Sequence, residues 1–130
     1  MERVTGIGGV FFKSKDPETL RAWYRDHLGL NLSEYGICVF EWGDEADPRR
    51  PGQTVWSLFP ADTSHFAPSA APFMLNYRVK NLHAMLAQLR GLGAKVEDRV
   101  DDSEYGKFGW VMDPEGNRIE LWEPPLQSSS

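Results

Sequence analysis

The chain repeats itself with a period of about half its length. Asp16 and Asn81 each precede a helical pattern of apolar residues, and they lie 65 residues apart in a chain of 130. Near the end of each half, Gly52 recurs 64 residues later as Gly116. A repeated supersecondary unit needs a second copy to bury its apolar face. The repeat therefore predicts that the two halves fold together.

Each half is predicted to contain one strand, one helix and three further strands. Asp16 is a candidate N-cap for the first helix and Gly29 a candidate residue for its end, and Asn81 is a candidate N-cap for the second helix. The predicted strands cover residues 5–13, 30–33, 36–42 and 53–59 in the first half, and residues 73–79, 95–101 and both arms of a hairpin over 105–124 in the second. A glycine pair inside the first strand, Gly8-Gly9, indicates a bulge or a close approach to the backbone.

The second arm of the final hairpin contains a carboxylate, Glu120, between two apolar residues. Residues 113–116 read Asp-Pro-Glu-Gly, which fits a type I turn. In the strand that follows, Ile119 and Leu121 alternate with Glu120. Because side chains alternate between the faces of a strand, Glu120 is predicted to lie on the face opposite these apolar residues.

These patterns predict an α+β fold with two tandem βαβββ modules, curved mixed sheets around a cleft, and the helices outside. We expect a single domain over residues 1–124, with module 1 at about 1–60, a linker at about 61–72 and module 2 at about 73–124. The polar, turn-rich segment 43–51 is expected to be a loop, and residues 125–130 a disordered tail.

Charge and composition restrict the partners. The net charge of −5 disfavours nucleic acid and anionic membrane surfaces, because both require a basic face. No apolar run is long enough to cross a bilayer. The single cysteine, Cys38, lies in an apolar strand pattern and is interpreted as a buried thiol. A cytoplasmic location is the default expectation.

Two motifs carry a resemblance to a known family. Residues 9–16 followed by 23–30 read as a strand, an aspartate and a helix ending in a Trp-Tyr…Leu-Gly pattern, and residues 113–124 read Asp-Pro-Glu-Gly-Asn followed by Glu-Leu. With the repeat, they resemble the vicinal oxygen chelate superfamily of glyoxalase I, extradiol dioxygenases, and fosfomycin- and bleomycin-resistance proteins. The resemblance implies a glyoxalase-like domain.

The resemblance also implies a metal site with four ligand positions, which correspond here to Gly9, Trp56, Met74 and Glu120, with Ser57 in place of Trp56 if the register slips by one residue. Only Glu120 keeps a ligand-type side chain. Zinc and other divalent transition metals require several His, Cys or carboxylate ligands. We therefore expect neither a tight metal site nor another cofactor, although a divalent metal stays open as an alternative.

The three histidines do not supply the missing ligands. His27 and His83 fall in predicted helices, and His65 falls in the predicted linker. Each is expected to have a surface or loop role.

The strand positions predicted to share the face of Glu120 give an apolar, aromatic lining with a few polar groups, which is typical of a small-molecule site. The candidate substrate-binding residues are Phe11, Trp56, Met74, Asn76, Arg78 and Trp110. The competing interpretation is structural: the tryptophans belong to the core, and Arg78 pairs with Glu120.

The favoured function is a metal-free small-molecule-binding protein of the glyoxalase/bleomycin-resistance type. The alternative is a lyase or isomerase in which Glu120 acts as general base and Arg78 or Asn76 holds an enolate-like oxygen. Under either hypothesis the partner is a small molecule, and a homodimer is plausible because many family members dimerise. The sequence does not identify the ligand.

Overall fold

The computed structural model describes residues 1–42 and 52–126. Its elements are β1 (Val4–Ser14), α1 (Pro17–Leu28), β2 (Cys38–Trp42), β3 (Gly52–Pro60), β4 (Phe73–Val79), α2 (Leu82–Gly91), β5 (Lys95–Val96), β6 (Asp101–Ser103), β7 (Gly106–Met112) and β8 (Arg118–Glu123). The predicted loop at 43–51 and most of the predicted tail, 127–130, lie outside the described residues.

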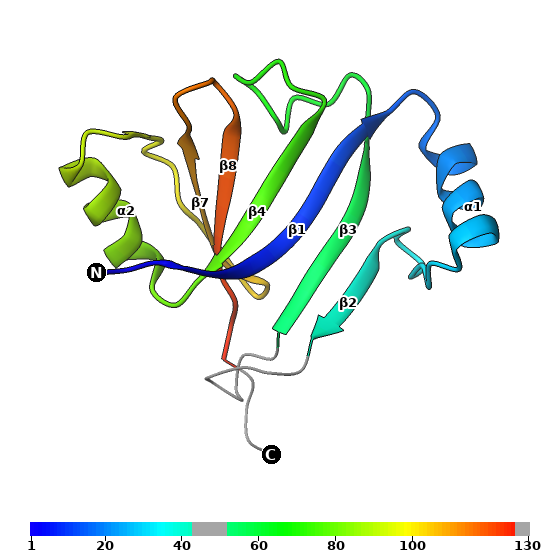
Figure 1. The fold of residues 1–130 in the computed structure, drawn as a ribbon, viewed down its shortest axis with the longest axis horizontal. Coiled ribbons are helices and arrows are strands. Elements are labelled where there is room, and N and C mark those ends of the chain that lie inside the picture. Colours follow the sequence, from blue (N-terminus) through cyan, green and yellow to red (C-terminus); the bar gives the residue numbers. More distant parts are fainter. Residues whose placement is uncertain (43–51, 127–130) are drawn as a thin grey trace.

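The strands of the described residues form one open mixed sheet. The strand order is β2-β3-β1-β4-β8-β7-β5, and β6 pairs with β7. The helices lie at opposite ends of this sheet, α1 beside β3 and α2 beside β7, as Figure 1 shows. The predicted α+β architecture, with helices on the outside, is confirmed.

The two modules meet where β1 pairs antiparallel with β4. Within each module the first strand pairs in parallel with the last, β1 with β3 and β4 with β8. The junction therefore relates the modules by an approximate twofold rotation, in which Gly9 faces Asn76 and Phe11 faces Met74. This relation matches the 65-residue repeat, because it maps Gly9 onto Met74 and Phe11 onto Asn76.

The predicted strand at 30–33 is wrong. Ser33 begins a turn instead: its side-chain oxygen accepts hydrogen bonds from the backbone N–H groups of Tyr35 and Ile37, and Gly36 has a positive φ of 77°. Side-chain capping of a turn and a left-handed glycine outweigh the short apolar alternation of Leu30 and Leu32. As a result, β2 is the edge of the sheet.

Both helices begin as the sequence predicts. Asp16 accepts a hydrogen bond from the Thr19 N–H, and Asn81 accepts one from the Ala84 N–H. Gly29 ends α1 in the left-handed conformation. No helix in the described part of the chain is long and apolar enough to cross a membrane.

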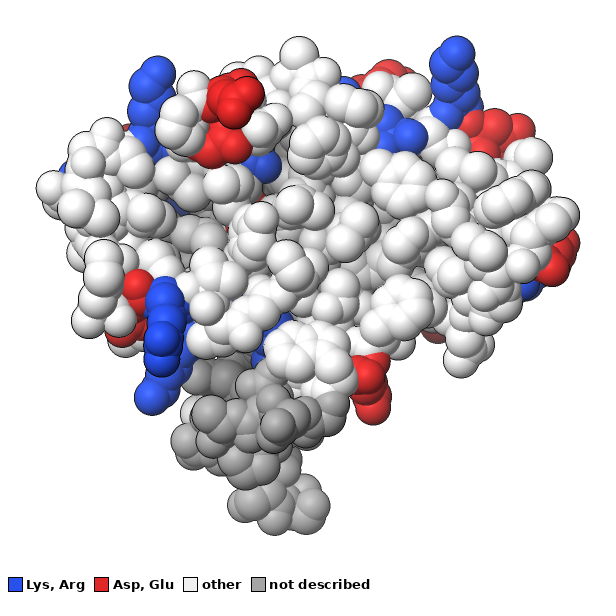
Figure 2. Space-filling model, viewed as in Figure 1, with Lys and Arg blue, Asp and Glu red and all other residues white. Residues whose placement is uncertain are grey.

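Apolar side chains form three buried clusters: one under each helix, and a third on the face of the sheet that the helices do not cover. The cluster under α2 includes Leu82, Met85 and Leu86, whereas no residue of α1 is fully buried. The third cluster lies on the other face of the sheet and consists of Phe11, Phe66, Met74 and Trp110, with Val55, Phe59 and Phe108 packed against it. Charged side chains are concentrated toward the edges of the face seen in Figure 2.

Candidate functional site

A pocket of about 410 Å³ opens between strands of both modules. Module 1 contributes residues of β1, β2 and β3, together with Ile37 just before β2. Module 2 contributes residues of β4, β7 and β8, the turn before β7 and the two prolines after β8. The lining residues are Gly8, Phe11, Ile37, Val39, Gln53, Val55, Asn76, Glu104, Tyr105, Phe108, Glu120, Trp122, Pro124 and Pro125. The wall is mostly apolar, so its few polar atoms determine which ligands fit.

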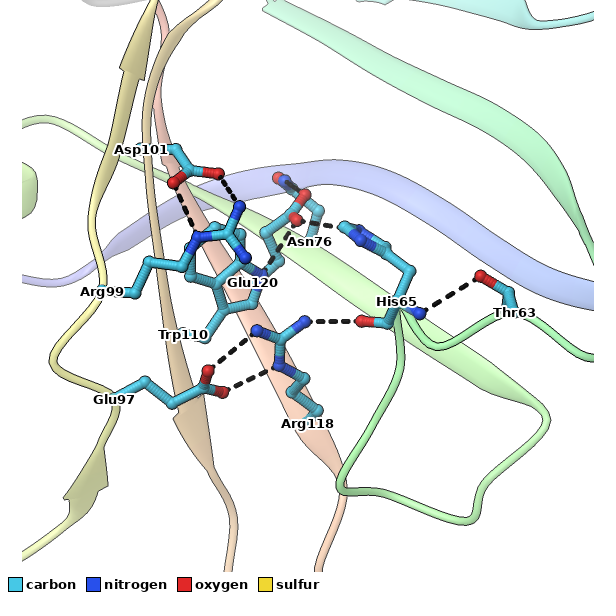
Figure 3. Close-up of polar contacts among 9 residues, drawn as sticks. All are labelled: Thr63, His65, Asn76, Glu97, Arg99, Asp101, Trp110, Arg118 and Glu120. Atoms are coloured by element: carbon cyan, nitrogen blue, oxygen red, sulfur yellow. Dashed lines mark hydrogen bonds and ion pairs between the residues drawn. The ribbon is translucent and has the colours of Figure 1, made fainter.

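Glu120 is the buried carboxylate of this wall, with only 4% of its surface exposed. Asn76 Nδ2 donates a hydrogen bond of 2.7 Å to Glu120 Oε1, and Trp110 Nε1 donates one of 3.0 Å to Oε2 (Figure 3). The strand register explains these contacts, because Glu120 lies directly opposite Asn76 on β4 and opposite Trp110 on β7. Two N–H donors from neighbouring strands thus fix the orientation of the carboxylate.

His65 is the third partner of Glu120. Its Nε2 lies 3.3 Å from Glu120 Oε2, and its ring stacks on Phe59 with 5.1 Å between the centroids. The His65 side chain is 37% exposed, so it connects the buried carboxylate with the surface. The sequence predicted only a loop role for His65, because the segment 61–72 has no periodicity that would indicate which way a side chain points.

Trp110 is itself held in place by two arginines. Arg118 lies over the indole ring at 4.7 Å and makes two hydrogen bonds of 2.8 Å to Glu97 (Figure 3). Arg99 also lies over the indole, at 5.2 Å. Arg118 further donates a hydrogen bond to the His65 carbonyl oxygen. This network orients both the indole and the histidine loop toward Glu120.

Asn76 has an acceptor that no described group satisfies. The residue is 2% exposed, and its Oδ1 atom has no hydrogen-bond partner. A Cβ atom on Gly8 would lie 2.3 Å from this oxygen, so only glycine fits there. The pairing of β1 with β4 shifts register between Ile7 and Gly9, which confirms the bulge predicted from the glycine pair.

The structure brings together some of the predicted site residues and separates others. Phe11, Asn76 and Glu120 line the pocket. Met74 and Trp110 lie in the buried cluster behind its wall. Arg78 lies outside the lining and is buried against the rings of Trp42 and Trp122, at 5.5 and 5.4 Å.

The prediction that Trp56 faces the cleft is wrong. Trp56 packs under α1, with its ring 4.9 Å from that of Tyr24 and 5.7 Å from that of Phe12. In the parallel pairs, Phe11 lies opposite Ser57 in the same way that Asn76 lies opposite Glu120. The counterpart of Glu120 is therefore Ser57. The spacing between these two residues is one residue shorter than the spacing between Gly52 and Gly116.

The four family ligand positions do not fit a divalent metal. Glu120 alone supplies a ligand of the preferred type, and N–H donors already contact both of its oxygens. Met74 is fully buried, and the Phe11 ring takes the space beside Gly9. Within residues 1–42 and 52–126 no group of three or more His, Cys, Asp or Glu side chains could hold a metal.

Comparison with known families gives the class of protein. The model of the glyoxalase-like domain family matches residues 9–122, so the chain belongs to this family. The resemblance drawn from the sequence motifs is thereby confirmed. No curated protein matches the chain by sequence.

Several solved structures share the fold. Methylmalonyl-CoA epimerase from Mycobacterium tuberculosis superposes with a TM-score of 0.60 at 24% identity, covering 94% of this chain and 89% of that one. A Streptomyces coelicolor methylmalonyl-CoA epimerase in complex with 2-nitronate-propionyl-CoA gives a TM-score of 0.68 at 16% identity, covering 97% and 99%. A glyoxalase/bleomycin resistance protein/dioxygenase superfamily member from Vibrio splendidus 12B01 gives 0.58 at 10%, covering 95% and 99%.

Proposed function

We propose that this protein binds a small molecule in the pocket between its two modules, with Glu120 as the anchoring group. One observation carries the proposal: a hydrogen-bonded carboxylate, 4% exposed, stands in the wall of an apolar pocket of about 410 Å³. Small-molecule sites typically combine an apolar lining with a few fixed polar groups. The pocket volume falls within the usual range for such sites, about 300–1,000 Å³.

The orientation of Glu120 supports a binding role. Asn76 and Trp110 hold the carboxylate in place before any ligand arrives, so a ligand loses little free energy in ordering it. Polar groups that are fixed in this way select ligands by hydrogen-bond geometry as well as by shape.

A thermal-shift screen of metabolites tests the proposal. We expect some compounds to raise the melting temperature of the wild type, because a ligand that binds only the folded state stabilises it. The Glu120→Gln variant should lose most of that shift. The matched control is Glu115→Gln, which removes the same charge from an exposed turn and should keep the full shift. A library that shifts neither the wild type nor the control would overturn the proposed function.

We further propose that binding needs no divalent metal, because one carboxylate is too small a donor set for a tight site. Metal analysis of purified protein should find well under one equivalent of zinc, nickel or iron. Ligand binding should also survive treatment with a chelator. About one equivalent of a metal, or loss of binding after chelation, would contradict this part of the proposal.

A second candidate is a lyase or isomerase. The contact between His65 Nε2 and Glu120 Oε2 favours it, because a half-exposed imidazole beside a buried carboxylate provides a path for a proton to solvent. In such a reaction Glu120 would take a proton from a ligand carbon and return it elsewhere on the ligand, or to water through His65. Incubating screened ligands with enzyme in D₂O would reveal exchange at carbon. Ligands that bind but neither exchange nor react would exclude this candidate.

The predicted homodimer and the predicted cytoplasmic location remain expectations from the sequence. Light scattering at several protein concentrations and localisation of a tagged chain would check them.

A further inference from the structure

We propose that the ligand carries a protonated amine or amidine on an apolar, preferably aromatic, skeleton. This inference deepens the proposed function and rests on it. It follows from three independent properties of the pocket: the sign of its charges, its unsatisfied acceptor and its aromatic walls.

The charges of the pocket are acidic. Glu104 and Glu120 are the charged side chains of the lining, and none of the described lining residues is a lysine, arginine or histidine. The whole chain carries a net charge of −5. An anionic ligand group would meet repulsion here, whereas a cationic group would be attracted.

Asn76 and Glu120 are hydrogen-bonded to each other in the pocket wall, and each has an oxygen atom that can accept a further hydrogen bond. Asn76 Oδ1 is buried and accepts no hydrogen bond from the described residues, and the Nδ2 atom of the same amide donates one of 2.7 Å to Glu120 Oε1. Oε1 accepts this one described hydrogen bond, so it retains capacity for another. An unsatisfied buried acceptor is unfavourable, and a donor on the ligand would remove that penalty. An ammonium or amidinium group offers two or more N–H donors to such a pair of oxygens.

The aromatic walls of the pocket suit the apolar skeleton of such a ligand. Phe11, Tyr105, Phe108 and Trp122 all line the pocket. The rings of Phe108 and Trp122 lie almost parallel, 6.0 Å apart with an interplanar angle of 5°, in an offset pair on neighbouring strands. Aromatic faces attract cations through their quadrupoles, and they pack well against a flat apolar skeleton.

The experiment compares compounds that differ only in the charge of one group. The first series is tryptamine, tryptophol and indole-3-acetate, and the second is 2-phenylethylamine, 2-phenylethanol and phenylacetate. Each compound is titrated into the full-length protein by calorimetry, with ligand-observed NMR for weak binders. The proteins are the wild type, Glu120→Gln and the control Glu115→Gln.

We expect the amine to bind about tenfold more tightly than the alcohol in at least one series, because an added charge-assisted hydrogen bond contributes about 1.4 kcal/mol or more. The acid should bind most weakly. Glu120→Gln should abolish the preference for the amine over the alcohol, while Glu115→Gln should keep that preference.

Two outcomes would overturn the ligand class. One is that the acid binds as tightly as the amine, and the other is that neither amine binds better than its alcohol. Either result leaves the proposed function intact if the metabolite screen still yields a ligand that depends on Glu120. Failure of that screen overturns the binding function itself, so the two failures are distinguishable.

Discussion

The two modules share one fold but contribute differently to the molecule. Module 2 buries Leu82, Met85 and Leu86 of its helix, whereas the helix of module 1 buries no residue completely. At equivalent positions in their last strands, module 2 has Glu120 and module 1 has Ser57. Module 2 therefore supplies most of the core and the polar chemistry, and module 1 supplies mainly an apolar wall.

This difference shows that a repeat in sequence and fold does not imply a repeat in function. The twofold relation sets which positions face the pocket, but the side chains at these positions differ between the modules. Phe11 corresponds to Asn76, so one module offers a ring where the other offers an amide. This asymmetry should be measurable in the stability of each module and in ligand binding.

The largest effect is expected in the helix cores. Leu86 is 1% exposed and packs in the cluster under α2, so Leu86→Ala should lower the free energy of unfolding by about 2–5 kcal/mol. Leu20 of α1 is only partly buried, so Leu20→Ala should lower it by about 1 kcal/mol. Urea denaturation of both variants measures the difference. Equal losses would contradict the asymmetry of the two cores.

An intermediate effect is expected at the junction of the modules. An added Cβ at Gly8 would lie 2.3 Å from Asn76 Oδ1 and 2.9 Å from Trp122, so Gly8→Ala should destabilise the fold by about 1–3 kcal/mol. It should also weaken ligand binding, because Asn76 must move. Gly91→Ala is the control, since nothing lies within 4 Å of its added Cβ and alanine favours a helix. If Gly8→Ala is as stable as Gly91→Ala, the close approach of β1 and β4 is not as described.

The smallest effect is expected at the helix N-caps, where the modules differ in pH dependence. The hydroxyl and backbone N–H of Thr19 bond the Asp16 carboxylate and lower its pKa below the ordinary value of 3.8. A carboxyl group with a lowered pKa stabilises the fold above its unfolded pKa, and this contribution is lost as the pH falls through the folded pKa. Asn81 carries no charge, so its capping contribution should not vary with pH.

Urea denaturation between pH 7 and pH 3 would measure this. Asn81→Ala should cost about 0.5–2 kcal/mol at every pH. The effect of Asp16→Ala should shrink as the pH falls below 3.8. If both effects keep a constant size, the lowered pKa of Asp16 does not contribute to stability.

Local chemistry made much of the fold predictable from the sequence. Asp16 and Asn81 are N-caps, because each depends on a hydrogen bond within a few residues. The bulge at Gly8-Gly9 was predictable because glycine inside a strand commonly marks one. The alternation of side chains along the last strand predicted that Glu120 lies on the face opposite Ile119 and Leu121. The missing strand at 30–33 is the exception, since turn chemistry at Ser33 and Gly36 outweighed a short apolar pattern.

The rest of the site depends on relations that the sequence does not display. Trp56 was misplaced because the face of β3 depends on its register with β1, which is one residue away from the spacing of the glycines. His65 was missed because its contact with Glu120 spans 55 residues and arises from a loop without periodicity. Contacts between side chains on different strands or loops can be recognised only from the tertiary structure.

The central claim is that a small molecule binds between the modules and is anchored by Glu120 of module 2, with no equivalent anchor at Ser57 of module 1. The most direct test is calorimetric titration of the tightest-binding compound from the metabolite screen into the wild type, Glu120→Gln and Ser57→Ala. We predict that Glu120→Gln weakens binding by about tenfold or more, and that Ser57→Ala leaves the affinity within about twofold. Unchanged affinity in Glu120→Gln, or an equal loss in Ser57→Ala, would contradict it.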